Sequence, residues 1–345
     1  MTSKLTIVLF LKERKYFNKR FLDYFCENNL NFNLLISDGS KKPIDRVLLN
    51  KIKKNKLIKY FKFPEDKSYN VFYKKIYKTL KLVKTKYVFF ASNDDFIIYK
   101  TLKKCIDFLT SQNKYIGCGG TMLGFDMLKK NKLDYKLSNF YHLYNYIKLD
   151  HLNKVDRFEN FIKNHNDLPK NCVMKTKVFL KTYKYSSNLF NNNVDFKDDF
   201  SCLYNVSCGR IKILNRPLIL HQAHLDSDAN NRGNMLKPIF VNKNFINDLI
   251  IFDKIIGAKL QLKKYVVMNK YYSHVLTGLI NTLDLRTEPS IKEIKNIFIK
   301  KLLRRILKTK VKKANFINRN LLDLETKNSI NKIEKYLKNS QIKNL

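Results

Sequence analysis

Tryptophan is absent from this chain of 345 residues, and glycine and proline are scarce, with 9 and 6 residues. Acidic residues are also few: the chain has 29 Asp and Glu but 68 Lys and Arg, which gives a formal net charge of +39 at pH 7. Such an excess usually indicates polyanionic partners such as nucleic acid, acidic lipid or phosphorylated substrates. The bases are spread along the whole chain, however, as a general compositional bias would spread them. Basicity alone therefore identifies no ligand.

Two further absences concern cysteine pairs and long apolar runs. The six cysteines form no CxxC pair and show no regular spacing, which argues against a zinc site and against a disulfide framework. We expect reduced thiols and a cytoplasmic location. No apolar run reaches the roughly 18 residues of a membrane span, and the apolar segment at 5–11 is short enough to be a first strand. An integral membrane protein is not predicted.

Hydrophobic patterning in the first 111 residues predicts strands that alternate with helices. Continuous apolar runs predict buried strands at 5–11, 32–36, 58–63 and 87–91. Apolar residues at helical spacing predict helices ending near 28 and covering 44–54, 69–83 and 100–111. This alternation is typical of a mostly parallel α/β sheet with helices on both faces.

The rest of the chain is less regular up to about residue 235. It predicts a glycine-rich turn at 117–120, a helix at 156–165 and a strand at 211–221, and it looks entirely helical from about 240. We therefore expect one α/β domain over residues 1–238 and a helical, basic C-terminal extension over 239–345.

Polar residues follow three of the predicted strands. Lys12 to Arg14 follow the first strand, Asp38 ends the second, and Asn93-Asp94-Asp95 ends the buried run VFFA. Ligands of such sheets bind at the carboxyl ends of the strands. Adjacent buried carboxylates are unfavourable unless a cation or proton compensates them, and Mg²⁺ or Mn²⁺ with a nucleoside diphosphate would do so. The alternative is a helix cap or a solvated turn.

These segments, TIVLFLKER, LLISDGS and KTKYVFFASNDDF, resemble the nucleotide-sugar-binding half of the GT-A glycosyltransferases, in particular glycosyltransferase family 2. The resemblance covers residues 4–125 well and 150–225 loosely. It implies that Asp38 contacts the nucleobase, that Arg14 matches an arginine often found after the first strand, and that Asn93-Asp94-Asp95 matches the DxD metal motif. Asn93 replaces the first aspartate of many relatives, and Phe10-Leu11 replaces their Pro-Thr.

The same resemblance implies Asp95, Asn93 and His221 as metal ligands, with Asp94 on the ribose or the metal. His224 is a second candidate histidine, and Arg232 or Lys237 would neutralise the leaving diphosphate. A general base is expected in VDFKDDF. Asp198 and Asp199 are both candidates, Asp199 being preferred, and the alternative for the pair is an N-terminal helix cap.

The expected activity is inverting, metal-dependent transfer of a sugar from a nucleotide-sugar donor to a saccharide or lipid-linked acceptor, in surface polysaccharide or glycolipid synthesis. The segment KKLLRRILKTKVKK at 300–313 has the pattern of a helix on anionic lipid at the inner membrane face, or of an ordinary packed helix. A nucleotidyltransferase is the first alternative, although FLKERKYF has no glycine for a phosphate loop. A nucleic-acid-binding protein is the second, and no specific nucleic acid is expected.

Overall fold

The computed structural model describes residues 4–28, 31–129, 135–137, 141–144, 146–164, 168–189, 193–223, 243–283 and 322–342. The strands are β1 (Leu5–Leu11), β2 (Asn33–Asp38), β3 (Ile58–Lys62), β4 (Tyr87–Ala91), β5 (Asp95–Ile97), β6 (Tyr115–Lys129), β7 (Tyr135–Leu137), β8 (Tyr141–Tyr144), β9 (Val173–Lys175) and β10 (Arg210–Ala223). The helices are α1 (Lys15–Glu27), α2 (Arg46–Lys53), α3 (Tyr69–Leu82), α4 (Tyr99–Ser111), α5 (Lys154–Lys163), the 3₁₀ helix η1 (Leu168–Asn171), α6 (Thr176–Ser186), α7 (Val194–Cys208), α10 (Lys243–Leu260), α11 (Val266–Leu283) and α13 (Leu324–Ile342).

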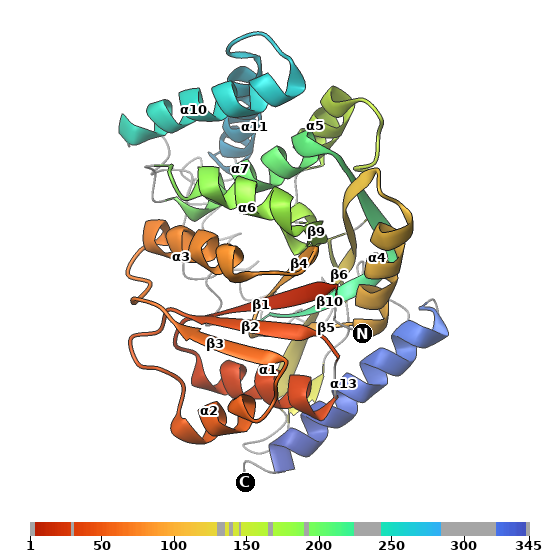
Figure 1. Ribbon diagram of the computed structural model, residues 1–345. Helices are drawn as coiled ribbons and strands as arrows, with labels where there is room; N and C mark the ends of the chain where they lie inside the picture. Colours follow the sequence, from red (N-terminus) through yellow and green to blue (C-terminus); the bar gives the residue numbers. More distant parts are fainter. Residues whose placement is uncertain are drawn as a thin grey trace, which may run out of the picture.

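The strands form one sheet in the order β3-β2-β1-β4-β9-β6-β10-β5, and β7 and β8 pair with β6. Strands β3, β2, β1 and β4 are parallel to one another, and β6 and β10 are parallel to each other, whereas β9 runs antiparallel to β4 and β6, and β5 runs antiparallel to β10. Helices α1 and α2 cover one face of the parallel part, and α3, α6 and α7 lie on the other (Figure 1). The mostly parallel α/β sheet predicted from the sequence is confirmed.

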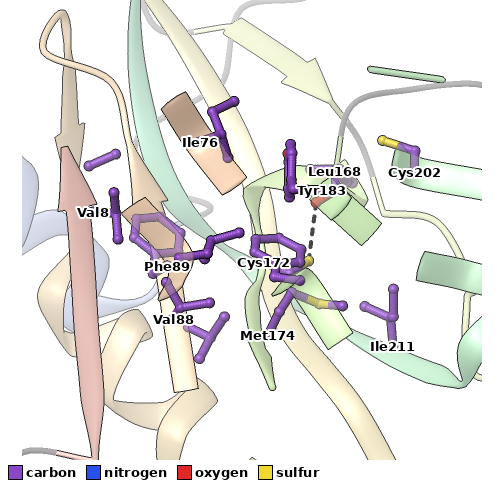
Figure 2. Packing of buried hydrophobic residues seen from close by; sticks show 14 of the residues in the cluster. Val8, Ile76, Val88, Phe89, Leu168, Cys172, Met174, Tyr183, Cys202 and Ile211 are labelled. Carbon is purple, nitrogen blue, oxygen red and sulfur yellow. Dashed lines mark hydrogen bonds between the residues drawn. The ribbon is translucent and has the colours of Figure 1, made fainter. Parts of the chain in front are cut away.

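The apolar runs became strands because both of their faces are covered. In β1 every side chain but that of Phe10 is buried, and Val88 and Phe89 of β4 are fully buried beside it. Figure 2 shows this core where β4 meets β9, with Val88, Phe89, Cys172 and Met174 packed together. The strands and helices predicted in the first 111 residues are all present, with small shifts at their ends.

The glycine-rich segment at 117–120 was wrongly predicted as a turn, because it lies inside the long strand β6. A Cβ atom on Gly119 would lie 2.4 Å from Cys172 Sγ, and one on Gly120 would lie 2.3 Å from the backbone oxygen of Arg216. The glycines therefore let neighbouring chain segments approach the strand closely. A single sequence does not distinguish such glycines from those of a turn.

The C-terminal helices pack on two different parts of the sheet domain. Phe196 of α7 contacts Phe245 and Phe252 of α10 and Tyr271 of α11. Helix α13 crosses near α1 and α4 (Figure 1). Its apolar side chains bury a second cluster formed by Tyr24, Phe96, Ile98, Leu123, Phe125, Leu220, Ile330, Ile333 and Leu337. In the part of the chain that the structure describes, no helix is both long and apolar enough to cross a membrane. The predicted boundary at residue 238 lies outside the described residues.

Candidate active site

The turn after β1 is the first part of the candidate site. Glu13 and Arg14 both have left-handed backbone, with φ of 52° and 49°, a conformation that is uncommon for residues with a side chain. Ser40, just beyond β2, holds the turn by accepting a hydrogen bond of 2.8 Å from the Glu13 amide. Such backbone persists only where its surroundings enforce it, and it clusters at functional sites.

The acidic doublet lies beside this turn and is buried, with Asp94 6% and Asp95 8% exposed. Arg14 Nη1 donates to Asp94 Oδ2 at 2.8 Å. Across the sheet edge, His221 Nδ1 lies 2.7 Å from Asp95 Oδ1. The structure therefore brings together four residues that the sequence had selected from three segments of the chain.

Asn93 is oriented by α1. Its side-chain Nδ2 donates to Asn18 Oδ1 at 2.6 Å, and Asn18 Nδ2 in turn donates to the backbone oxygen of Glu13 at 2.6 Å. Because the amide nitrogen of Asn93 faces Asn18, its amide oxygen is the atom that could serve as a ligand.

The doublet does not cap a helix and is too buried to be a solvated turn, so both forms of that alternative are wrong. Asp95 begins β5, a three-residue strand that the sequence analysis did not predict, and α4 starts only at Tyr99. The helix-cap alternative for Asp198 and Asp199 is wrong as well, because Asn193 caps α7 by accepting from the Phe196 amide.

The charges of Asp95 and His221 are coupled. Burial raises the pKa of Asp95, and the hydrogen bond and charge of His221 oppose that rise. For His221, burial on its own lowers the pKa, but the hydrogen bond and charge of Asp95 and the charge of Asp94 together outweigh it, so the pKa is raised. Basic groups of the protein thus compensate part of the charge of the doublet, in addition to the divalent metal expected from the sequence.

The residue types of the site are ones that can bind a divalent cation, and metal binding itself stays a prediction. No group of three His, Cys, Asp or Glu side chains with metal-binding geometry is found among the described residues. Mg²⁺, however, is commonly held by one or two carboxylates together with substrate phosphates, Mn²⁺ also prefers carboxylate and carbonyl oxygen, and neutral imidazole is a common metal ligand. Asp94, Asp95, the amide oxygen of Asn93 and His221 supply those ligand types at one place.

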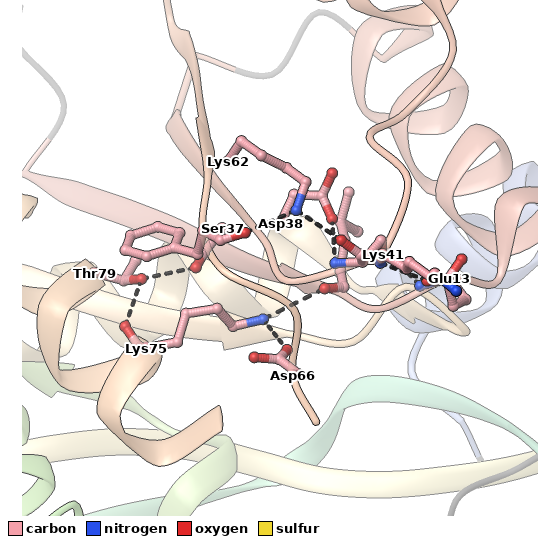
Figure 3. Close-up of polar contacts among 11 residues, drawn as sticks. Glu13, Ser37, Asp38, Lys41, Lys62, Asp66, Lys75 and Thr79 are labelled. Atoms are coloured by element: carbon pink, nitrogen blue, oxygen red, sulfur yellow. Dashed lines mark hydrogen bonds and ion pairs between the residues drawn. The ribbon is translucent and has the colours of Figure 1, made fainter. Parts of the chain in front are cut away.

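Asp38 lies at the end of β2 and is fully buried. Its Oδ1 accepts from the Ser40 amide at 2.8 Å, and its Oδ2 accepts from the Tyr60 hydroxyl at 2.5 Å. Figure 3 shows Asp38 within a polar network that reaches Glu13 through Ser40 and Lys41. Contacts therefore run from Asp38 to the turn that carries Arg14, while the predicted role of Asp38 at the nucleobase stays a prediction.

A buried ion pair lies below this network. Lys75 Nζ pairs with Asp66 Oδ2, and both side chains are almost completely buried (Figure 3). The Gly39 amide donates to the backbone oxygen of Leu11, and a Cβ on Gly39 would lie 2.2 Å from Asp66 Oδ2. Glycine in the Asp-Gly-Ser segment is therefore required for the ends of β1, β2 and the loop after β3 to pack together.

Asp198 and Asp199 lie in the second turn of α7 and are half-buried. Asp198 accepts hydrogen bonds from the Tyr73 hydroxyl and from Lys170 Nζ, the latter at 2.6 Å. Asp199 Oδ2 accepts from the Tyr271 hydroxyl at 2.7 Å. These partners belong to α3, η1 and α11, so helices orient both candidate bases. Their role as a base stays a prediction.

Arg20 and Gln222 belong to the site but were missed by the sequence analysis. Arg20 is 4% exposed, and its Nη2 donates to the backbone oxygen of Asp94 at 2.8 Å. An available signal was that Arg20 lies among Phe17, Phe21 and Tyr24, on the apolar face of an amphipathic helix. His224, Arg232, Lys237 and the basic segment 300–313 lie outside the described residues.

The sheet order, the helices on its two faces and the acidic turn after β4 define the GT-A fold, as the sequence predicted. The chain is similar to the crystal structure of TarS 1-349 from S. aureus, with a TM-score of 0.53 and 12% sequence identity over 84% of this chain and 77% of that one. It is similar to the same protein in complex with UDP-GlcNAc, with a TM-score of 0.52 at the same identity and coverage. No protein-family model and no curated protein sequence matches the chain. The likeness establishes the fold.

Proposed function

We propose that this chain is a glycosyltransferase that moves a sugar from a nucleoside-diphosphate sugar to an acceptor hydroxyl. The observation that carries the proposal is that Arg14, Asp94, Asp95 and His221 converge at the carboxyl edge of a GT-A sheet. Ligands of open α/β sheets bind at this edge. The complex of the similarly folded TarS with UDP-GlcNAc supports a nucleotide-sugar as the donor class.

Asp95, Asn93 and His221 are the proposed ligands of a Mn²⁺ or Mg²⁺ ion, with Asp94 on the metal or the donor ribose. When bound, such a cation would neutralise the diphosphate as it leaves. Arg14 is placed to assist, because it is a quarter exposed and its guanidinium already lies against Asp94. A guanidinium can stabilise charge that develops on a phosphate oxygen.

The proposed chemistry is a single displacement with inversion. The acceptor oxygen forms a bond to the anomeric carbon while the bond between that carbon and the diphosphate oxygen breaks, and the nucleoside diphosphate leaves with the bonding electrons. The proton of the acceptor hydroxyl passes to Asp199. Asp199 is the preferred base and Asp198 the alternative, as in the sequence analysis; Asp198 accepts from Tyr73 and Lys170, and Asp199 accepts from Tyr271.

The acceptor is proposed to be a saccharide or a lipid-linked saccharide. The basic, leucine-rich segment at 300–313 is the reason for expecting a peripheral contact with anionic lipid at the inner membrane face. Sedimentation with vesicles of anionic or of neutral lipid tests this contact. Binding to the anionic vesicles alone is expected, and binding to both kinds or to neither would contradict the contact.

The donor class is tested by measuring melting temperature with UDP, GDP and other nucleoside diphosphates, each with and without Mn²⁺. Stabilisation by at least one nucleotide, larger with Mn²⁺, is expected, because binding to the folded state alone raises stability. Incubation with the matching nucleotide-sugar should then release nucleoside diphosphate. Release of sugar 1-phosphate instead would indicate nucleotidyl transfer, and no effect of any nucleotide would contradict the proposal.

A further inference from the structure

Arg20 lies in the middle of α1, immediately behind the acidic doublet. One end of its guanidinium, Nη2, donates to the backbone oxygen of Asp94 at 2.8 Å. The other end, Nη1, donates to Gln222 Oε1 on β10. One side chain therefore joins two segments that are 128 residues apart, the turn after β4 and the end of β10.

The place of this bridge follows from the pairing of β5 with β10. The antiparallel register places Ile97 opposite Ile219, Phe96 opposite Leu220 and Asp95 opposite His221. The next pair in this register would be Asp94 with Gln222, but the pairing of β5 with β10 ends one residue earlier. Arg20 inserts at that position and hydrogen-bonds both residues, so it continues the connection just beyond the Asp95–His221 pair.

The surroundings of Arg20 hold its guanidinium in one place. Its Cζ lies 4.9 Å from the ring centre of Phe17 and 4.7 Å from that of Phe96. From the other side, the Tyr336 hydroxyl of α13 donates to the Arg20 backbone oxygen at 2.9 Å. Burying a cation is unfavourable unless it is well bonded, and both acceptors of Arg20 in these bonds are neutral groups. Burial lowers the pKa of Arg20, and the charges of Asp94 and Asp95 are among the nearby groups that oppose this effect.

We propose that Arg20 is a positioning residue of the metal–diphosphate site, which clamps the backbone of Asp94 to Gln222 and thereby holds Asp95 opposite His221. This inference rests on the proposed function. Arg20 is not expected to touch the donor, because it lies behind the doublet and is 4% exposed. Residues that orient metal ligands from behind typically change metal affinity by about 10- to 100-fold when they are replaced.

The chain offers a matched control in Arg157 of α5. Arg157 is 5% exposed, and it too donates to neutral acceptors, the backbone oxygens of Val206, His151 and Leu152. Arg20→Met and Arg157→Met thus each remove a buried guanidinium together with its hydrogen bonds. Only Arg20→Met removes a hydrogen bond to the acidic doublet. Arg20→Lys provides a milder variant, which keeps the charge but cannot reach both acceptors in the same way.

The test is a titration of the wild-type chain and its variants with Mn²⁺, in which the electron paramagnetic resonance signal of free Mn²⁺ measures binding. UDP is present throughout, or GDP if only GDP binds. Melting temperatures are recorded in parallel, and binding is measured well below them. Arg20→Met should weaken Mn²⁺ binding by at least about tenfold, with Arg20→Lys in between. Arg157→Met should lower the melting temperature and leave Mn²⁺ affinity unchanged.

Two results would overturn the inference in distinguishable ways. If the wild-type protein binds Mn²⁺ with the nucleotide and Arg20→Lys or a folded Arg20→Met binds it equally well, Arg20 is only structural and the proposed function stands. If the wild-type protein binds neither Mn²⁺ nor any nucleotide, the proposed function fails and this inference fails with it.

Discussion

Asp95 and His221 are register partners on β5 and β10, and His221 Nδ1 lies 2.7 Å from Asp95 Oδ1. The pair connects a short strand that follows the acidic turn to a long strand from the second half of the domain. Because Arg14 pairs with the neighbouring Asp94, each carboxylate of the doublet has a different basic partner. This arrangement keeps two buried acids together at the edge where a GT-A sheet binds its ligand.

The proposed base is tested by comparing Asp199→Asn with Asp198→Asn. Asp199→Asn should reduce the release of nucleoside diphosphate from the donor by about 10²- to 10⁴-fold, because a general base contributes rate acceleration of that order. Donor binding should change little, since the residue acts on the acceptor. The measurement is turnover of the donor together with its dissociation constant.

Asp198→Asn serves as the partner variant because Asp198 is held by Tyr73 and Lys170. It should lower the melting temperature, because it weakens the bonds to Tyr73 and Lys170, and it should reduce turnover less than Asp199→Asn does. The opposite order of turnover would move the role of base to Asp198, and full activity of both variants would contradict a base in α7.

The glycines of β6 give a prediction about stability. Gly120→Ala should destabilise the protein by about 2 kcal/mol or more, because the new Cβ would lie 2.3 Å from a backbone oxygen that cannot simply rotate away. Gly257→Ala is the control, since a Cβ there meets nothing closer than 3.9 Å inside α10. It should stabilise by about 0.5–1 kcal/mol through helix propensity. Chemical denaturation checks both values, and equal effects would contradict the packing described for β6.

Lys197 predicts a dependence of stability on pH. Burial lowers the pKa of this lysine to about 8, from 10.5 in a model lysine. Between these two values the unfolded chain binds more protons than the folded one, so the free energy of unfolding should rise with pH. The free energy of unfolding should rise by about 1–2 kcal/mol between pH 8 and 9.5. The destabilisation that comes from burying a protonated Lys197 is fully present at pH values well below 8.

Lys197→Met should remove this rise, whatever it does to stability itself through the lost bonds to the backbone oxygens of Ser186 and Leu189. The quantity to compare is therefore the slope of unfolding free energy against pH in urea titrations. A slope that is the same in the variant and the wild-type protein would show that Lys197 does not titrate in this range.

The parallel half of the sheet could be predicted from the sequence because its strands are buried on both faces. Runs such as LTIVLFL and YVFFA carry that information within a few residues, and the helices between them have clear apolar faces. Arg14, Asp38 and the acidic doublet could be selected for the same reason, since each follows directly from the end of a predicted strand.

The remaining features depend on contacts between distant segments. Nothing local to Asp95 indicates His221 as its partner, and Arg20 is joined to Gln222 across 202 residues. The glycines of β6 look like a turn until β9, the preceding Cys172 and β10 are placed against them. Strand β5 was not predicted because three residues that begin with a carboxylate give no periodic pattern, and its pairing with β10 is what makes it a strand.

The central claim is that the doublet ties a cation to a diphosphate, and it is tested most directly by calorimetric titration of UDP or GDP with and without Mn²⁺. The proteins compared are the wild type, Asp95→Ala and Asp107→Ala, because Asp107 is an exposed aspartate on α4. The account predicts Mn²⁺-dependent binding in the wild type and in Asp107→Ala, and its loss in a folded Asp95→Ala. Binding of the nucleotide to Asp95→Ala with unchanged affinity and unchanged dependence on Mn²⁺ would contradict it.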